Sequence, residues 1–363
     1  MIELNMNKVS MIKVNKRLHV ISFISLLLTA CGGSDSTNNN NEINNSNSSS
    51  NEVTSSQFST VQEVLDDAVL KGVDGVVVYI DQSNKENESF ASGLQNKVTQ
   101  LSADANSLFK IASISKLFIA VSAVKVIAQE QLNLHDTLAF WLPDLASSIE
   151  NSNSITIEHL IQHRSGIADF DSQTGFDWQN SHTDIDNTLF YALNKPADFS
   201  PDSQYEYSNT NYLLLAKILD KALGYSHEIF IRENILNPLM MENTYLTLSE
   251  IDLSLLSKGY WGNIERSTQD YVIPGGSMIS TAKDIAVFIR ALNTGSLLNS
   301  IEKNIYSSVY WFNHSGWLPG YQSIASYDNK TDAVVVQFIN TTGGNSEAIA
   351  SATNSQIFEL LVR

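Results

Sequence analysis

The chain has little cysteine, little proline and few basic residues for its length. Its 363 residues include 1 Cys, 6 Pro, 22 Lys and Arg, and 39 Asp and Glu, which gives a formal net charge of −17. A single cysteine excludes a disulfide within the chain. The excess of acidic residues repels nucleic acid and anionic lipid, so we expect no nucleic-acid partner. With 43% hydrophobic residues, the chain can still bury a substantial core.

The first apolar run of the chain is short. Residues 20–28 are too few to span a bilayer, and four basic residues precede them between positions 8 and 17. This order is typical of a secretory signal peptide, which we assign to residues 1–30. The residues Leu-Thr-Ala-Cys at 28–31 resemble the lipobox of bacterial lipoproteins. The resemblance implies a lipid anchor on Cys31 in the bacterial cell envelope, at the periplasmic face or the outer membrane; the alternative is a cleaved signal with an incidental cysteine.

The next segment is poor in apolar residues. Residues 31–57 are nearly all Asn, Ser, Thr, Gly and acidic residues, with too little apolar surface to offset the entropy of ordering. We predict a disordered tether there, which would reach roughly 30 Å as a flexible coil. Residues 58–363 are expected to form one large domain, with a sheet lobe at about 58–112 and 270–363 and a helical lobe at about 113–269.

Hydrophobic periodicity predicts the layout of this domain. One-sided apolar spacing predicts helices, and β-branched runs predict strands. Strands at both ends with helices between them argue for one sheet completed by both ends, plus a mainly helical insert. The fold class is therefore α/β, of the α+β type. The expected helices cover residues 59–71, 113–130, 212–223, 227–235, 282–292 and 346–361, and the expected strands cover 73–80, 90–93, 306–312, 321–327 and 333–339.

A serine and a lysine three residues apart can form a reactive pair, and this spacing occurs six times. The pairs begin at Ser10, Ser107, Ser113, Ser122, Ser280 and Ser300. The other five are predicted to lie in the signal peptide, before a helix, within a helix core, at a helix start and in a polar surface turn. Only Ser113 and Lys116 lie in the first turn of a long buried helix, where residues i and i+3 are neighbours and the helix dipole favours an alkoxide. The alternative is a helix cap with a lysine that extends to the surface.

Two later motifs support the catalytic interpretation. Tyr207-Ser208-Asn209 lies just ahead of a helix and offers a phenol and an amide two residues apart. His314-Ser315-Gly316 lies at a strand end, where the glycine lets another backbone approach closely. Together with the Ser113 pair, these motifs resemble the three active-site motifs of the serine β-lactamase and penicillin-binding-protein-like hydrolases. The similarity is to the branch with class C β-lactamases, D-Ala-D-Ala carboxypeptidases and esterases, and it spans about residues 60–363.

The resemblance implies a β-lactamase-like fold, with an antiparallel sheet flanked by helices, and a serine hydrolase without a cofactor. Ser113 would attack a carbonyl group and form an acyl-enzyme, with Lys116 or Tyr207 as the base. Lys116 can serve only with its pKa lowered from about 10.4 toward 7 or 8, and a Tyr207 phenolate would be stabilised by Lys116 and His314. Backbone N–H groups of Ser113 and Trp317 would form the oxyanion hole. The substrate-binding residues would be Asn209, His314, Ser315, Gly316 and Trp317.

The motifs leave the substrate open. Relatives that recognise a terminal carboxylate usually carry a hydroxyl residue where this chain has Trp317. This difference weakens the case for a D-Ala-D-Ala or penicillin carboxylate and strengthens the esterase alternative. We predict a hydrolase that acts on small peptide amides or β-lactams. The alternatives are a carboxylesterase of the same fold and a non-catalytic cell-wall-binding lipoprotein.

Other kinds of site fit the sequence less well. His159 and His163 have the helical spacing of a zinc site, but Leu160 stands where a metalloprotease needs glutamate. We therefore expect no metal. The acidic clusters at Asp66-Asp67 and at residues 169 and 171 are interpreted as solvated faces or turns, not as a paired-carboxylate site.

Overall fold

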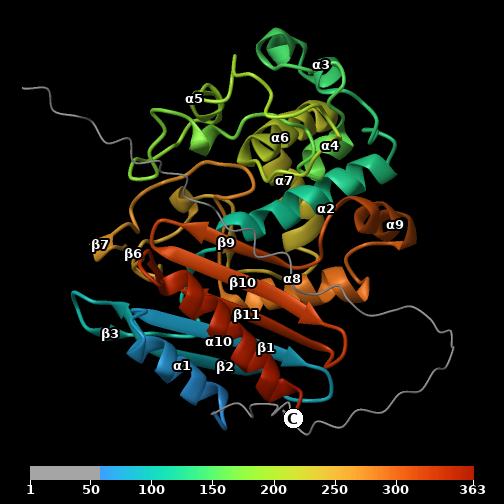
Figure 1. Ribbon diagram of the computed structural model, residues 1–363. Helices are drawn as coiled ribbons and strands as arrows, with labels where there is room; N and C mark the ends of the chain where they lie inside the picture. Colours follow the sequence, from blue (N-terminus) through green and yellow to red (C-terminus); the bar gives the residue numbers. More distant parts are fainter. Residues whose placement is uncertain (1–57) are drawn as a thin grey trace, which may run out of the picture. The chain divides into compact units, whose positions relative to one another are not determined.

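The computed structural model describes residues 58–363 (Figure 1). The predicted signal peptide, Cys31 and the tether lie outside the described residues. Within 58–363, none of the helices has the length and apolar character needed to cross a membrane.

The central sheet consists of six antiparallel strands drawn from both ends of the described chain (Figure 1). Their order is β3-β2-β1-β11-β10-β9. Val77 of β1 lies opposite Phe338 of β11, so the first and last long strands pair in the middle of the sheet. This arrangement confirms the predicted fold class. The strands span Gly75–Gln82 (β1), Glu88–Asn96 (β2), Leu101–Ser102 (β3), His314–Leu318 (β9), Tyr321–Asp328 (β10) and Ala333–Ile339 (β11).

Both faces of the central strands β1 and β11 are buried, which explains their unbroken β-branched runs in the sequence. Helices α1 (Val61–Leu70) and α10 (Ser346–Leu361) pack on one face, and α8 (Ala282–Thr294) packs on the other (Figure 1). Along β1, Val76 and Val78 join the core under α1 and α10, whereas Val77 joins the larger core on the opposite face. A strand covered on both sides needs apolar side chains at successive positions.

The segment between the two halves of the sheet is mainly helices and loops, as predicted. Its central helix, α2, is buried on nearly every face, and α6 and α9 pack against it (Figure 1). The helices span Ser115–Ala128 (α2), Leu138–Trp141 (α3), Ile157–Ile161 (α4), Ile185–Leu189 (α5), Asn209–Leu223 (α6), His227–Ile231 (α7) and Ser300–Val309 (α9). Short strands pair in two small sheets: Phe109–Lys110 (β4), Thr244–Tyr245 (β5), Tyr260–Trp261 (β6), Ile264–Glu265 (β7), Ile279–Ser280 (β8) and Thr341–Thr342 (β12).

Two predictions of secondary structure are wrong. None of residues 306–312 is a strand, because α9 covers Ser300–Val309 and the next strand, β9, begins at His314. The side chain of Asn299 accepts from the backbone N–H of Glu302 at 3.0 Å, and the Glu302 carboxylate accepts from the Asn299 N–H at 2.8 Å. This capping box starts a helix where the sequence suggested a surface turn. The helix expected from residue 113 begins instead at Ser115, after a 3-10 turn at Ala112–Ile114.

Candidate active site

Ser113 lies in a tight turn between a short strand and the central helix. The turn is the 3-10 helix Ala112–Ile114, which connects β4 to α2. Ala112 has a φ of 51°, in the left-handed region that is uncommon for residues other than glycine. The Ser323 hydroxyl donates to the Ile111 carbonyl oxygen at 2.7 Å and ties the turn to β10. A constrained turn therefore presents the serine at the entrance to α2.

Lys116 brings its amine to the Ser113 hydroxyl, as predicted. Its Nζ atom lies 3.1 Å from Ser113 Oγ, 2.8 Å from Asn209 Oδ1 and 3.0 Å from the Gly275 carbonyl oxygen. The side chain is only 1% exposed. Burial lowers the pKa of Lys116 to about 7, although two nearby carboxyl groups act in the opposite direction. A large share of the amine is therefore neutral near pH 7 and able to accept a proton.

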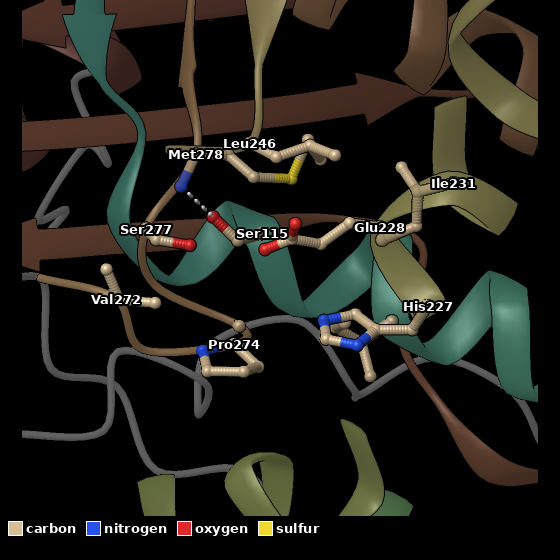
Figure 2. Close-up of a pocket in the computed structure, with 11 residues that line it drawn as sticks. Ser115, His227, Glu228, Ile231, Leu246, Val272, Pro274, Ser277 and Met278 are labelled. Carbon is tan, nitrogen blue, oxygen red and sulfur yellow. Dashed lines mark hydrogen bonds between the residues drawn. The ribbon is translucent and has the colours of Figure 1, made fainter. Parts of the chain in front are cut away.

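The carbonyl group of Gly275 reaches Lys116 because glycine allows a close approach. A Cβ atom at this position would lie 2.9 Å from Lys116 Cγ. Figure 2 shows how the segment is fixed to the start of α2: the Met278 N–H donates to Ser115 Oγ at 3.3 Å. A small cavity lies at this junction, and its lining includes Ser115, Gly275, Ser277, His227 and Glu228 but not Ser113 (Figure 2).

Tyr207 lies beside the Ser113–Lys116 pair as a neutral phenol. Its ring stacks on His163 with the centroids 4.3 Å apart, and Lys116 Nζ lies 5.0 Å from the Tyr207 ring centroid. The hydroxyl is buried next to Ser113 but forms no hydrogen bond of normal geometry within residues 58–363. Burial raises the pKa of Tyr207, and the Ser113 side chain offsets this only in part. Of the two side chains, Lys116 is therefore the one better able to accept a proton near pH 7.

His314 faces Tyr207 from the edge strand β9. Its Nε2 atom pairs with the Tyr310 hydroxyl at 3.0 Å, and its Nδ1 atom pairs with the Ser315 carbonyl oxygen. A carbonyl oxygen can only accept, so Nδ1 carries the proton and Nε2 accepts from the tyrosine. Burial, followed by the charge of Lys116, lowers the pKa of His314 to about 4. Contrary to the sequence prediction, His314 is neutral near pH 7 and supplies no positive charge to a Tyr207 phenolate.

Gly316 lets β9 touch the turn that carries Ser113. A Cβ atom there would lie 2.5 Å from the Ile111 carbonyl oxygen and 2.8 Å from Ala112 Cβ. Because β9 is an edge strand, the N–H groups on its outer side are not used by the sheet. The close approach therefore brings the backbone that leads into Trp317 beside the Ser113 turn, which suits the predicted oxyanion hole.

The side chains on either side of Gly316 are not joined to the Ser113–Lys116 pair. Ser315 is exposed. The Trp317 indole N–H donates to Glu347 Oε1 at 2.9 Å, and its ring meets Trp178 and Trp261 edge to face, at centroid distances of 6.5 and 5.9 Å. Trp317 held in this way contributes an apolar aromatic wall.

The sequence interpretation missed two carboxyl groups at the site. Asp169 and Asp171 accept hydrogen bonds from the side-chain amide of Asn209 at 3.1 and 3.2 Å. Burial raises the pKa of both carboxyl groups. The interpretation of this cluster as a solvated turn is therefore wrong. The polar sequence around it gives no sign that a residue 40 positions later packs against it.

The two histidines considered for zinc do not share a helical face. Helix α4 ends at Ile161, and His163 lies beyond it with a φ of 56°. His159 Nδ1 accepts from the Thr156 N–H at 3.3 Å, and His163 Nδ1 accepts from the Ser208 N–H at 3.1 Å. The helical spacing that suggested zinc is therefore not formed.

The chain is similar to known sequences. The family model described as Beta-lactamase matches residues 61–308. The chain is 28% identical over 207 residues to penicillin-binding protein 4* of Bacillus subtilis (strain 168), which covers 55% of this chain and 44% of that relative. It is 25% identical over 252 residues to a β-lactamase of Pseudomonas fluorescens, which covers 68% of this chain and 63% of that relative. The chain thus spans less than two thirds of the length of both relatives.

Solved structures share the fold at low sequence identity. One is D-amino acid amidase from Ochrobactrum anthropi SV3 in complex with L-phenylalanine amide, with a TM-score of 0.73, 22% identity, and coverage of 83% of this chain and 97% of that chain. Another is EstCE1, a hydrolase with promiscuous acyltransferase activity, with a TM-score of 0.65, 19% identity, and coverage of 81% and 97%.

The chain shares its fold with these solved structures, and the family model matches most of its sequence. Because the family model covers more than half of the chain, the protein belongs to the β-lactamase family. The family resemblance predicted from the three motifs is confirmed.

Proposed function

We propose that the protein hydrolyses small amides through an acyl-enzyme on Ser113. The observation that carries the proposal is the 3.1 Å contact between Ser113 Oγ and the Nζ atom of Lys116, whose pKa is lowered to about 7. A neutral amine has two hydrogens and one lone pair. The amine can donate its two hydrogens to the Asn209 side-chain oxygen and the Gly275 carbonyl oxygen, and its lone pair can accept the hydrogen of the Ser113 hydroxyl.

In the first step, Lys116 takes the hydroxyl proton while Ser113 Oγ bonds to the substrate carbonyl carbon. Such proton transfer is worth about 10² to 10⁴ in rate. The backbone N–H groups of Ser113 and Trp317 would hold the resulting oxyanion, each contributing roughly 3 to 4 kcal/mol. The bond to the leaving amine then breaks, and the amine receives the proton from Lys116, directly or through Tyr207. Water releases the acyl group by the same steps and restores the serine.

The proposed substrates are small peptide or amino-acid amides and β-lactams. Relatives of this chain are named as a penicillin-binding protein and a β-lactamase, and a structure of the same fold is a D-amino acid amidase. The aromatic wall of Trp317, Trp178 and Trp261 suits a substrate with an apolar group.

An ester substrate is the second candidate. His314 is neutral near pH 7, and Trp317 stands where a hydroxyl would bind a carboxylate. These two features remove contacts that an anionic peptide or penicillin would need, whereas a neutral ester needs neither. EstCE1 shows that the fold also supports a hydrolase with acyltransferase activity.

The test is covalent labelling of the purified protein with a fluorescent penicillin and a fluorophosphonate, with Ser113→Ala as the comparison. We expect a Ser113-dependent adduct, followed by turnover of phenylalanine amide, a chromogenic cephalosporin or p-nitrophenyl esters. Labelling by the fluorophosphonate alone would assign the esterase. Absence of a Ser113-dependent adduct with either probe would leave the non-catalytic lipoprotein as the better reading.

A further inference from the structure

Asp169 binds the start of helix α6 from a separate element. Its Oδ1 atom accepts from the backbone N–H groups of Asn209 at 2.9 Å and Thr210 at 3.2 Å. The residue at the usual capping position, Ser208, makes no such bond with its side chain. Asp169 therefore takes the place of the cap, and the positive end of the helix dipole favours a negative charge on this carboxyl group.

Asp171 completes a carboxyl pair around the same asparagine. The side-chain nitrogen of Asn209 donates to Asp169 Oδ2 at 3.1 Å and to Asp171 Oδ2 at 3.2 Å, and Asn209 Oδ1 accepts from Lys116 at 2.8 Å. Both amide hydrogens and the amide oxygen are thus engaged by the protein. Asn209 therefore fixes the Lys116 amine in place, and a substrate could accept a hydrogen bond from its amide nitrogen only if a bond to one of the two carboxyl groups broke.

The carboxyl pair is the source of negative charge that Lys116 meets. Within residues 58–363, the titratable groups that face Lys116 come from a second 3-10 turn at Phe170–Ser172, the loop after α4, β9 and the start of α6. They are Asp169, Asp171, His163, His314, Tyr207 and Tyr212. Burial lowers the pKa of both histidines and raises the pKa of both tyrosines, so all four are neutral near pH 7. Two partly buried carboxyl groups at one amide do not both ionise readily.

We propose that Asp169 and Asp171 hold one proton between them, position Asn209, and set the proton affinity of Lys116 with their single negative charge. This inference rests on the proposed function of Ser113 and adds two positioning residues to it. With one charge, the pair lets the Lys116 amine exchange its proton near pH 7. With two charges, it would keep the amine protonated and unable to act as a base. The pKa of Asp169 is raised further than that of Asp171, chiefly by burial, but the two backbone N–H bonds at the helix start favour the charge on Asp169, so we assign the proton to Asp171.

The test compares pH profiles of kcat/KM for Asp171→Asn and the double variant D169N/D171N. In Asp171→Asn the amide imitates the protonated acid. The acidic limb of the profile, where kcat/KM falls as the pH is lowered, should therefore stay at its wild-type pH. The double variant removes the remaining charge, so its acidic limb should move down by about one pH unit. The proposal is overturned if the double variant leaves the limb in place, or if Asp171→Asn alone produces half or more of the double variant's shift.

Asp284→Asn is the matched control. Asp284 is a buried acid whose pKa is raised by burial, and its Oδ2 atom accepts from the Asn243 N–H at 2.9 Å, but it is not among the groups that face Lys116. The Asp284→Asn substitution should lower thermal stability without moving the acidic limb of the pH profile. If the acidic limb of this control moved as far as that of the double variant, the shift would come from the loss of any buried carboxyl group. That result would overturn the assignment of the effect to Asp169 and Asp171.

Infrared difference spectroscopy tests for the shared proton independently of enzyme activity. The wild type near pH 7 should show the carbonyl band of a protonated carboxyl group, and Asp171→Asn should lose it. Retention of the band in that variant would overturn the proposal even if the double variant does not fold. Absence of Ser113-dependent turnover would instead reject the proposed function, and the infrared result would still decide the state of the pair.

Asn209→Ala separates positioning from substrate binding. A positioning role predicts a large loss of kcat with KM changed less than threefold, because the Lys116 amine loses the contact that orients it toward Ser113 while the substrate contacts remain. A KM raised tenfold or more with kcat unchanged would return Asn209 to substrate binding and overturn its place in the network.

Discussion

Lys116 occupies a position where a permanent cation would be costly. We expect Lys116→Arg to lower kcat/KM by about 10² to 10⁴, because a guanidinium keeps its charge and cannot act as the base. Initial rates with the best substrate of the labelling test would measure the change. Lys125→Arg is the matched control, since Lys125 is a lysine of the same helix whose Nζ donates to the Leu297 carbonyl oxygen at 2.9 Å. Equal losses in the two variants would mean that the effect is structural.

The direction of the pH dependence follows from the same lysine. Protonated Lys116 cannot accept the Ser113 proton, so kcat/KM should rise with pH through about 7, the value to which burial lowers the pKa of Lys116. His314, with its pKa lowered to about 4, should add no limb near neutral pH. Rates measured from about pH 5 to pH 9 in buffers of constant ionic strength would show this. A profile that falls as the pH rises through 7 would contradict a lysine base.

At the scale of elements, the contact of β9 with the Ser113 turn depends on the absence of a side chain at position 316. In Gly316→Ala the new Cβ would meet the Ile111 carbonyl oxygen at 2.5 Å and push the strand from the turn. We expect a loss of stability of about 1 to 3 kcal/mol, typical of overpacking, and a larger fractional loss of kcat than in Ser315→Ala, where the side chain is exposed. Chemical denaturation and steady-state rates would measure the two effects. Wild-type rates in Gly316→Ala would show that this contact does not form the oxyanion hole.

Elements with a strong periodic pattern could be predicted from the sequence. The terminal helix at 346–361 and the strand at 333–339 were predicted with the bounds that the structure shows, because their apolar residues are packed into a core. Residues 306–312 were predicted wrongly because Tyr306, Tyr310 and Phe312 favour a strand by composition. The capping box of Asn299 and Glu302 and the packing of α9 on α2 stabilise a helix there instead.

The residues of the candidate site could be predicted only where they belong to a short sequence motif. Ser113, Lys116 and Tyr207 belong to short motifs, and the structure brings them together. Asp169 and Asp171 gain their role from Asn209, which lies in another element, and no local pattern reveals that contact. The neutral state of His314 likewise depends on its burial beside Tyr310 and Lys116. Contacts between elements and the burial of charge therefore account for what the sequence could not supply.

At the scale of the whole molecule, all the residues proposed for catalysis lie within residues 58–363, whereas Cys31 lies ahead of them. We propose that a lipid on Cys31 holds the protein in the bacterial cell envelope and that the hydrolase domain acts without it. Burial of acyl chains contributes about 0.8 kcal/mol per CH₂, and two signals or chains are needed for stable attachment. The surface of an acidic chain with a net charge of −17 would not bind anionic lipid by charge alone.

Cys31→Ser in the full chain should therefore move the protein from the membrane fraction to the soluble envelope fraction or leave its signal uncleaved, and it should abolish incorporation of a labelled fatty acid. Ser113→Ala is the matched control, because it should remain lipidated and membrane-bound while losing its acyl-enzyme label. The turnover number of a version that begins at residue 58 should equal that of the anchored protein. Fatty-acid labelling that persists in Cys31→Ser, or membrane attachment that survives in a processed Cys31→Ser protein, would place the anchor elsewhere, since residues 58–363 hold no helix able to cross a membrane.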